Sequence, residues 1–216
     1  MFMNKIKYLL VSAIFAMFAT ASVAQVSVGI SGTGFSADAT GSETQDTSQS
    51  RDETLEAAYG SVFIEYDFGG FSVGIDAIPY TIDSETATND QSNAKVDSGT
   101  NTVQVDIENV VTLYGIVPLS DTGAYLKAGI IQGDLITNEA MGATSTSYPD
   151  ADLDGETVMI GYAYDTGAGA TVRLEAGLTD YDDVSVTGTG GDGTANTVTL
   201  SGLDGTTVRL SIVKAF

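Results

Sequence analysis

The last ten residues of the chain, 207–216, alternate between apolar and polar side chains and end on an aromatic residue. The apolar set shares one parity: Val208, Leu210, Ile212 and Phe216. Arg209 and Ser211 fall on the other parity. Because successive side chains of a β-strand point to opposite faces, this segment predicts a strand with one apolar and one polar face. In a chain that also begins with an export signal, the apolar face is predicted to contact lipid.

The same alternation recurs along the chain and predicts an all-β protein. It appears in seven earlier segments: about 25–37, 55–68, from 71 to the polar stretch 83–100, 102–119, 124–135, 156–164 and 170–181. The last strand begins as early as Asn196, which gives eight strands in total. Residues 25–216 are few enough for one domain, predicted to be a barrel.

The connections between these segments alternate between short and long. Tight turns are predicted at Gly69-Gly70, at 120–123 and at 165–169, because glycine adopts positive φ without strain. The other connections are long and polar: 40–53, 83–100, 138–154 and the Asp/Gly/Thr-rich stretch after 181. Outer-membrane barrels have this asymmetry, with short periplasmic turns and longer extracellular loops.

Aromatic residues gather at the strand ends beside the tight turns and the C-terminus. Six form a predicted girdle at one membrane interface: Tyr66, Phe68, Phe71, Tyr162, Tyr164 and Phe216. Tyr114 and Tyr125 lie near the same end but on the inward parity, so either a bulge or a lumenal role is expected for them. A soluble β-sandwich has no reason to collect its aromatic residues at one end.

The first 24 residues have the features of a cleaved secretory signal peptide. Lys5 and Lys7 precede an apolar run from 8 to 18, and Ala-Ser-Val-Ala at 21–24 fits a cleavage site before Gln25. The alternative is an N-terminal membrane anchor, but the apolar run is shorter than the ~20 residues that a spanning helix needs.

These patterns together resemble the small eight-stranded outer-membrane β-barrels, such as the OmpA-type membrane domain, OmpX and the opacity-like proteins of the porin family. The most specific element of the resemblance is the terminal strand that carries Val208, Leu210, Ile212 and Phe216. The resemblance implies an antiparallel, up-and-down transmembrane barrel in the bacterial outer membrane, present as a monomer. It also implies that the terminal strand is the signal read by the barrel-assembly machinery. The roles it implies are envelope integrity, adhesion or surface display.

Composition excludes several classes of function. The sequence has no Cys and no His, which removes disulfides, thiolate chemistry and the commonest general base and metal ligand. Outer-membrane hydrolases that rely on a histidine base are therefore excluded, and no enzyme activity is predicted. The leader holds two of the 8 Lys and Arg residues and none of the 29 Asp and Glu residues, so the mature chain is strongly acidic. Nucleic acid is not expected as a partner.

The inward parity of the predicted strands collects charged residues of both signs, with Asp76 among them. The predicted lumenal network contains Glu65, Asp67, Lys127, Arg173, Glu175 and Arg209. An eight-stranded barrel has an interior just wide enough for side chains to fill, so these charges should pair and plug the lumen. The alternative is that the same residues line a small pore or form a gate.

One short motif has specific chemistry. Asp150, Asp152 and Asp154 form a D-x-D-x-D-G run with Gly155, which resembles the first half of an EF-hand loop and predicts a weak Ca²⁺ site. The twelfth position of such a loop is Gly161, so the distal bidentate ligand is missing. The alternative is a solvated acidic loop, and no other cofactor is predicted.

Three functions follow from the sequence. The first is a structural or surface-display barrel with a plugged polar lumen and acidic extracellular loops. The second is a small channel or a conduit for small solutes, including apolar ones. The third is a secreted soluble β-protein that binds Ca²⁺ or carbohydrate.

Overall fold

The computed structural model describes residues 25–45, 47–84, 87–93, 96–140, 147–189 and 195–216. The predicted signal peptide, 1–24, lies outside the described residues. Among the residues that are described, no helix is long and apolar enough to cross a membrane.

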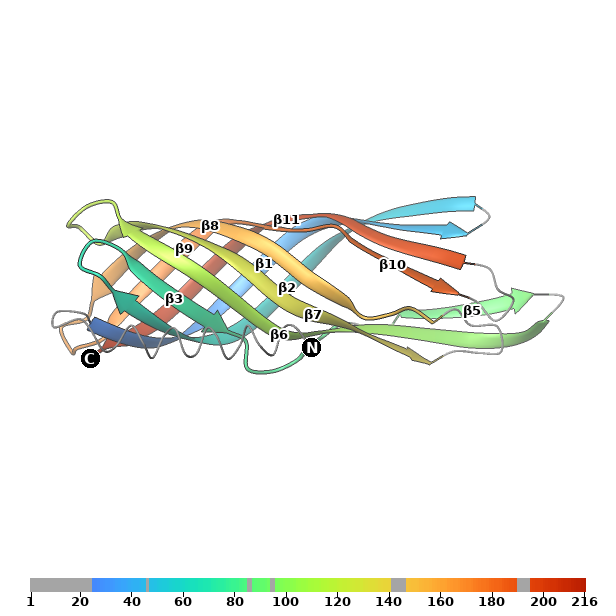
Figure 1. The fold of residues 1–216 in the computed structure, drawn as a ribbon, viewed down its shortest axis with the longest axis horizontal. Helices are drawn as coiled ribbons and strands as arrows, with labels where there is room; N and C mark the ends of the chain where they lie inside the picture. Colours follow the sequence, from blue (N-terminus) through green and yellow to red (C-terminus); the bar gives the residue numbers. More distant parts are fainter. Residues whose placement is uncertain (1–24, 46, 85–86, 94–95, 141–146, 190–194) are drawn as a thin grey trace.

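Eight antiparallel strands form a closed ring (Figure 1). In order around the ring they are β1 (Gln25–Gln45), β2 (Thr47–Asp67), β3 (Ser72–Ala77), β6 (Val96–Pro118), β7 (Ala124–Ala140), β8 (Ala151–Asp165), β9 (Thr171–Tyr181) and β11 (Ala195–Ala215). The first and last members pair with each other and close the barrel. Three short strands extend this ring: β4 (Ile82–Asp83) and β5 (Ala87–Asn93) pair with β6, and β10 (Val184–Thr189) pairs with β11. The predicted eight-stranded, up-and-down antiparallel barrel is confirmed.

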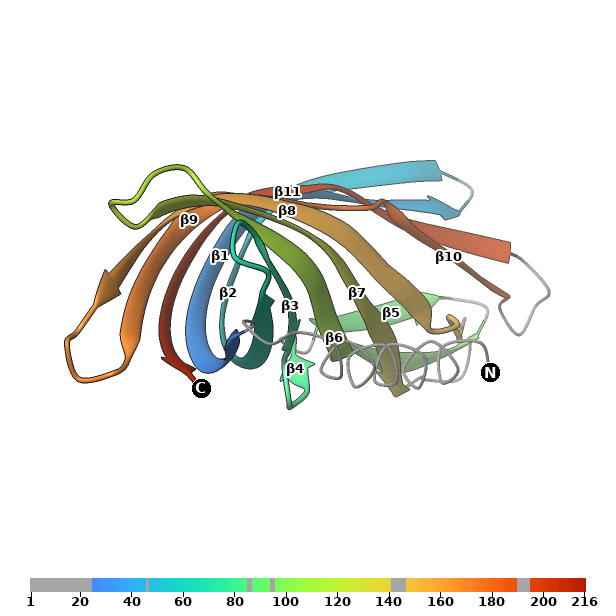
Figure 2. The same ribbon diagram turned by 60° about the vertical axis from the view of Figure 1, so that its left-hand side comes forward.

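The strands are strongly staggered around the barrel. A path of directly paired residues that leaves β1 at Ser27 passes through every neighbouring strand and returns to β1 at Ala37, ten residues further on. This stagger is the shear that a closed barrel requires, and it tilts the strands relative to the barrel axis. The tilt is plain in the ribbon when the barrel is seen from two sides (Figures 1 and 2).

Three tight turns and the C-terminus lie at one end of the barrel (Figure 1). Gly69 has φ 84° and Gly123 has φ 100°, values that side chains disfavour. In the first turn, Asp67 accepts a 2.7 Å hydrogen bond from the amide of Gly69. The amide of Phe216 donates a 2.8 Å hydrogen bond to the carbonyl of Val26, which ties the last residue to the first strand.

The opposite end differs from the sequence prediction. The polar stretch 40–53, predicted as a loop, continues the ladder of β1 and β2 until Gln45 pairs with Thr47. Strand β5 likewise lies inside the predicted loop 83–100, and β10 inside the polar stretch after 181. The strands therefore run far past the predicted ends and form long hairpins (Figure 1). Polar Ser and Thr residues suit a strand with both faces in water, but they lack the alternation that marks a strand against lipid.

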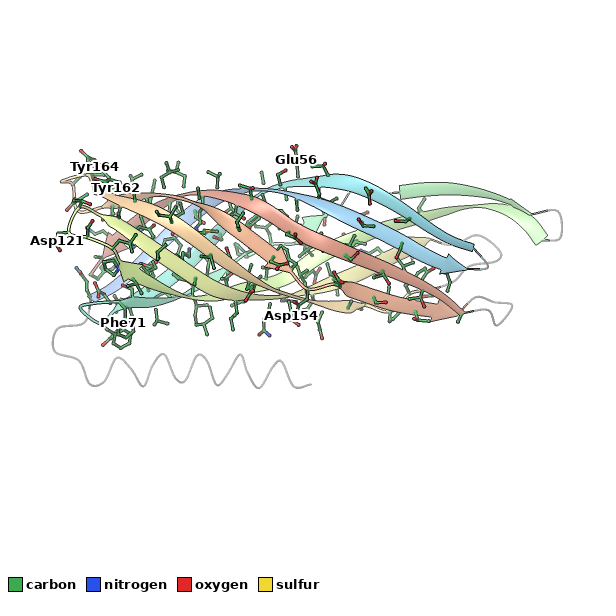
Figure 3. The ribbon with its side chains drawn as sticks, turned by 90° about the horizontal axis from the view of Figure 1, so that it is seen from above. Glu56, Phe71, Asp121, Asp154, Tyr162 and Tyr164 are labelled. Atoms are coloured by element: carbon green, nitrogen blue, oxygen red, sulfur yellow. The ribbon has the colours of Figure 1, made fainter. Side chains whose placement is uncertain are left out.

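The alternation of polar and apolar residues inverts along the long strands, as β8 illustrates. On β8, Val158 and Ile160 point outward with exposed fractions of 58% and 57%, and Thr157 points inward. Four residues closer to the hairpin end on each face, the outward side chain is Asp154 instead of Val158, and the inward one is the buried Leu153 instead of Thr157. In Figure 3 Tyr162 and Tyr164 lie at the end with the tight turns, whereas Glu56 and Asp154 lie near mid-length on the outer surface. An apolar belt thus surrounds the half of the barrel near the turns, and an acidic surface surrounds the other half.

A bulge opposite β7 maintains this pattern on β6. The register with β7 shifts between Glu108 and Val111, so two residues, Asn109 and Val110, oppose one residue of β7. Asn109 has φ 53° and donates a 2.7 Å hydrogen bond from its side chain to Asp134. The extra residue reverses the parity of β6, because a one-residue shift moves every following side chain to the other face. Ile107 therefore faces the interior, where it packs against the apolar core.

Within the described residues, the wall of the barrel is discontinuous beside β3. Strand β3 pairs with β2 only from Ser72 to Ala77, and β4 and β5 pair with β6 alone. Pro79 lies directly after this strand, and its lack of an N–H group prevents the ladder from continuing there. Among the described residues, the part of β2 beyond Val62 has a strand partner on one side only, which is β1. The hairpins β1–β2 and β5–β6 diverge at this end in both ribbon views (Figures 1 and 2).

Candidate functional site: a charged plug in the lumen

The strongest interaction in the lumen joins β2 to β9. Both terminal nitrogens of Arg173 donate hydrogen bonds to Glu65, at 2.6 and 2.8 Å. The carboxylate of Glu65 is 3% exposed. This fork-to-fork geometry is the strongest form of a protein ion pair, and it spans the lumen from opposite sides of the ring.

A second cluster of charges lies beside the first. Arg209 forms an ion pair with Asp76, and its Nε lies 3.3 Å from Oε2 of Glu175. Lys127 reaches the same oxygen of Glu175 at 3.4 Å. Glu175 is 1% exposed and is one of the most deeply buried side chains of the protein. Ser61 adds a 2.8 Å hydrogen bond to Asp76 and extends the network to β2.

Two tyrosines link these charges to the barrel wall. Tyr114 donates a 2.8 Å hydrogen bond to Glu65, and Tyr125 donates one of 2.9 Å to Glu175. The ammonium group of Lys127 lies 4.1 Å from the ring centroid of Tyr114. Each tyrosine therefore satisfies a buried carboxylate with its hydroxyl, and the face of Tyr114 also contacts a cation. The sequence left open a bulge or a lumenal role for these two residues, and the structure gives them the lumenal role.

Glycines provide the space for the aromatic rings. A Cβ atom at Gly74 would overlap the ring of Tyr114, and one at Gly161 would overlap the ring of Tyr125. Each glycine is the direct cross-strand partner of its tyrosine: Gly74 on β3 is opposite Tyr114 on β6, and Gly161 on β8 is opposite Tyr125 on β7. The rings lie flat against the wall because these positions have no side chain.

The network balances three carboxylates with three cations: Glu65, Asp76 and Glu175 with Lys127, Arg173 and Arg209. Five of these six residues belong to the network predicted from the sequence, and Asp76 is added to it. Asp67 lies outside the network, at the first tight turn, where it bonds the amide of Gly69. Asp67 has the same parity as Glu65 on β2. Only its greater distance from the other charges keeps it out of the network. Buried charges of this kind are tolerated only when each is paired and hydrogen-bonded, as it is here.

An apolar layer closes the lumen on the hairpin side of these charges. Ile78, Val110 and Ile131 are buried in contact with one another. Around them pack four partly buried side chains: Tyr59, Ile82, Ile107 and Tyr181. A cavity of about 30 Å³ between the two layers is lined by polar groups that include Thr33, Asp76 and Arg209. That volume is sufficient for about one or two water molecules.

Five of the six predicted girdle residues are exposed at the end with the tight turns: Phe68, Phe71, Tyr162, Tyr164 and Phe216. Phe68 and Phe71 stack across the first turn with ring centroids 4.8 Å apart. Tyr66 is only 9% exposed, and its ring contacts that of Phe68 edge-on. The terminal-strand residues Val208, Leu210 and Ile212 are exposed on the outer face, whereas Arg209 and Ser211 are buried.

The predicted Ca²⁺ ligands do not converge. Asp152 and Asp154 lie on β8 itself rather than in a loop, and Asp150 directly precedes this strand. Asp150 accepts a hydrogen bond from the amide of Thr137, and Asp154 accepts one from Gln132. Among the described residues, no group of three or more metal-ligating side chains is arranged to hold a metal.

These features define a class of protein. A closed ring of eight antiparallel strands, a lipid-type outer belt and a filled polar lumen give the fold of a small bacterial outer-membrane β-barrel. The chain is similar to the outer membrane protein OprG from Pseudomonas aeruginosa, with 12% sequence identity and a TM-score of 0.54 over 88% of this chain and 95% of that one. It is also similar to the outer membrane protease OmpT from Escherichia coli, with 10% identity and a TM-score of 0.51 over 89% and 97% of the two chains. At these identities the likeness extends to the fold. No family model matches the sequence, and no curated protein matches it.

Proposed function

We propose that this chain is a non-conducting outer-membrane barrel that contributes to the integrity of the envelope and displays acidic hairpins at the cell surface. The observation that carries the proposal is the closed lumenal network, in which Glu65, Asp76 and Glu175 are each paired with a cation. The apolar layer around Ile78 forms a second barrier above it. An ion that entered the lumen would have to break buried ion pairs before it could pass.

The direction of insertion follows from the two ends of the barrel. The end with the tight turns faces the periplasm and the hairpin end faces the medium, because outer-membrane barrels have short periplasmic turns. The exposed aromatic residues at the turns lie at the inner interface, where amphipathic rings are favoured. The terminal strand with Phe216 serves as the assembly signal, and the barrel functions as a monomer.

Conductance in planar bilayers tests the proposal. The full mature chain, refolded in detergent and checked by the difference in gel mobility between boiled and unboiled samples, is expected to show no single-channel steps. Steady steps from the folded wild type would instead establish a channel, the second function considered from the sequence.

A matched pair of variants sharpens this test. Arg173→Ala removes a cation whose partner, Glu65, lies in the lumen, whereas Lys214→Ala removes an exposed cation at the periplasmic end. Only the first is expected to weaken the plug, through loss of stability or appearance of current. If Arg173→Ala raises conductance while stability is unchanged, the network is a gate rather than a structural plug.

A further inference from the structure

The discontinuity beside β3 leaves a long edge of β2 that has no strand partner among the described residues. Strand β2 pairs with β1 along its whole length, from Gln45–Thr47 to Gln25–Asp67. On its other side, the described ladder stops at Val62. The segment 47–61 therefore has a free edge on the hairpin side of the apolar belt. Such an edge presents a row of unpaired N–H and C=O groups.

The hydrogen bond of Gly60 identifies which groups lie on this edge. The Gly60 amide donates a 2.5 Å hydrogen bond to the hydroxyl of Tyr80, on the side away from β1. Because backbone groups of alternate residues point to the same side of a strand, the amides of Ala58, Glu56 and Thr54 also point to the free edge. Tyr80 replaces a strand partner only at the first of these positions, next to the lipid belt.

Two different surfaces border this edge. On the inner face, Leu55 is 40% exposed although its cross-strand neighbour Ala37 is buried. On the outer face, the side chains of Asp52 and Glu56 are exposed. The edge thus combines free backbone groups with an apolar inner face and an acidic outer face.

This combination selects the chemistry of a partner. We propose that the free edge of β2 binds an extended peptide segment whose residues alternate between apolar and basic, added as an extra strand. Apolar side chains of the segment cover Leu55, and basic side chains pair with Glu56 and Asp52. A second copy of this chain is disfavoured, because edge-to-edge pairing of two β2 strands would bring their acidic outer faces together.

The probe is a fluorescein-labelled ten-residue peptide of alternating Lys and Val, measured by fluorescence anisotropy with the full mature chain in zwitterionic nanodiscs. We expect binding of the Lys peptide, and no binding of a matched peptide of alternating Glu and Val.

Two N-methylated forms of the Lys peptide, methylated at every Lys or at every Val, have the same charge and composition. In antiparallel addition, residues that exchange hydrogen bonds have side chains on the same face, so the Lys amides face β2. Methylation at Lys is therefore expected to abolish binding, and methylation at Val to leave it.

Substitutions at Glu56 locate the site. Glu56→Pro removes an edge-facing amide that β1 does not use, and Glu56→Val removes the same charge but keeps the amide. Glu56→Pro is expected to weaken binding about tenfold more than Glu56→Val, because it removes a hydrogen bond and also blocks the approach of the added strand. The boiled and unboiled gel mobilities verify that both variants fold.

Several results would overturn the proposal. Equal binding of the two methylated peptides would show that charge alone attracts them, as would equal effects of the two substitutions. No binding of the Lys peptide at all would reject the site. The inference rests on the proposed display function only in requiring that the hairpin end face the medium. Its outcome is separate from that of the conductance test, because peptide binding and channel activity are measured independently.

Discussion

Arg173 and Glu65, which are 108 positions apart in the sequence, form a two-pronged ion pair across the lumen. The pair joins the second strand of the ring to the seventh, so it constrains the barrel only after the ring has closed. Removal of one partner leaves the other charged, buried and unpaired, which costs far more than loss of the contact itself.

The first prediction concerns this pair. Arg173→Ala should lower the free energy of unfolding by about 3 kcal/mol or more, because it leaves Glu65 unpaired. Urea or guanidinium titrations of the refolded barrel, followed by gel mobility, measure the change. The double variant Arg173→Met with Glu65→Gln removes both charges and should be markedly less destabilised than Arg173→Ala. Equal losses in the two proteins would show that the ion pair is not the cause.

The second prediction concerns the glycines beneath the lumenal tyrosines. Gly74→Ala should destabilise the barrel by about 1–3 kcal/mol, because the new Cβ overlaps the ring of Tyr114 and forces it away from Glu65. Gly32→Ala is the matched control, since a Cβ there has no heavy atom within 4 Å. Its effect on the unfolding midpoint should be small. A similar loss in both variants would mean that glycine matters for the strand in general.

The third prediction concerns the bulge on β6. Insertion of one glycine after Glu108 should prevent correct folding, because it moves Ile107 out of the core and turns Glu108 toward the interior. The expected readout is loss of the folded, faster-migrating gel band. Deletion of Asn109 is the control, since it leaves Glu108 opposite Asp134 and Ile107 inside, so this variant should fold. An insertion variant that folds as well as the deletion variant would show that the residue count at the bulge does not fix which face Ile107 takes.

The fourth prediction concerns a row of like charges on the outer surface. Four carboxylates are direct cross-strand neighbours on β8, β9, β11 and β1: Glu156, Asp180, Asp204 and Asp38. Like charges directly opposite each other destabilise a sheet. Asp180→Asn should therefore raise the free energy of unfolding by about 0.5 kcal/mol at low salt, and by less at 1 M salt, where screening is strong. Asp121→Asn, in a tight turn, is the control and should have no such salt-dependent gain.

Much of the fold was predictable because lipid imposes a strict rule on each strand. Residues that alternate between lipid and lumen, such as Leu210 and Arg209, reveal the strand and its orientation at once. The tight turns were predictable for a local reason, since Gly69 and Gly123 supply the positive φ that these turns require. Where strands leave the membrane the rule no longer applies, so the sequence pattern predicts a loop at 40–53, where β1 and β2 continue their ladder.

The lumenal site was predictable in its residue types but not in its connections. Parity assigned Glu65, Asp67 and Asp76 to the interior alike. Whether each carboxylate pairs with a cation depends on its position along the barrel axis. That position is set by the stagger between strands that are distant in sequence. The bulge at Asn109 and the free edge of β2 are likewise determined by tertiary pairing. Pro79 is the one local signal, visible in the sequence, that β3 stops early.

The inversion of polarity along the strands also makes insertion directional. On β8 the outward residues beyond the apolar belt are Glu156, Asp154 and Asp152. In the proposed orientation, these carboxylates cross the hydrocarbon region once, while the hairpins are carried to the far side of the membrane. Once the lumen is filled with side chains, the barrel wall is rigid. Movement of the folded barrel back toward the periplasm would then draw the same carboxylates into lipid. The acidic half of the barrel therefore opposes withdrawal from the membrane. The folded protein is held there by a kinetic barrier as well as by its apolar belt.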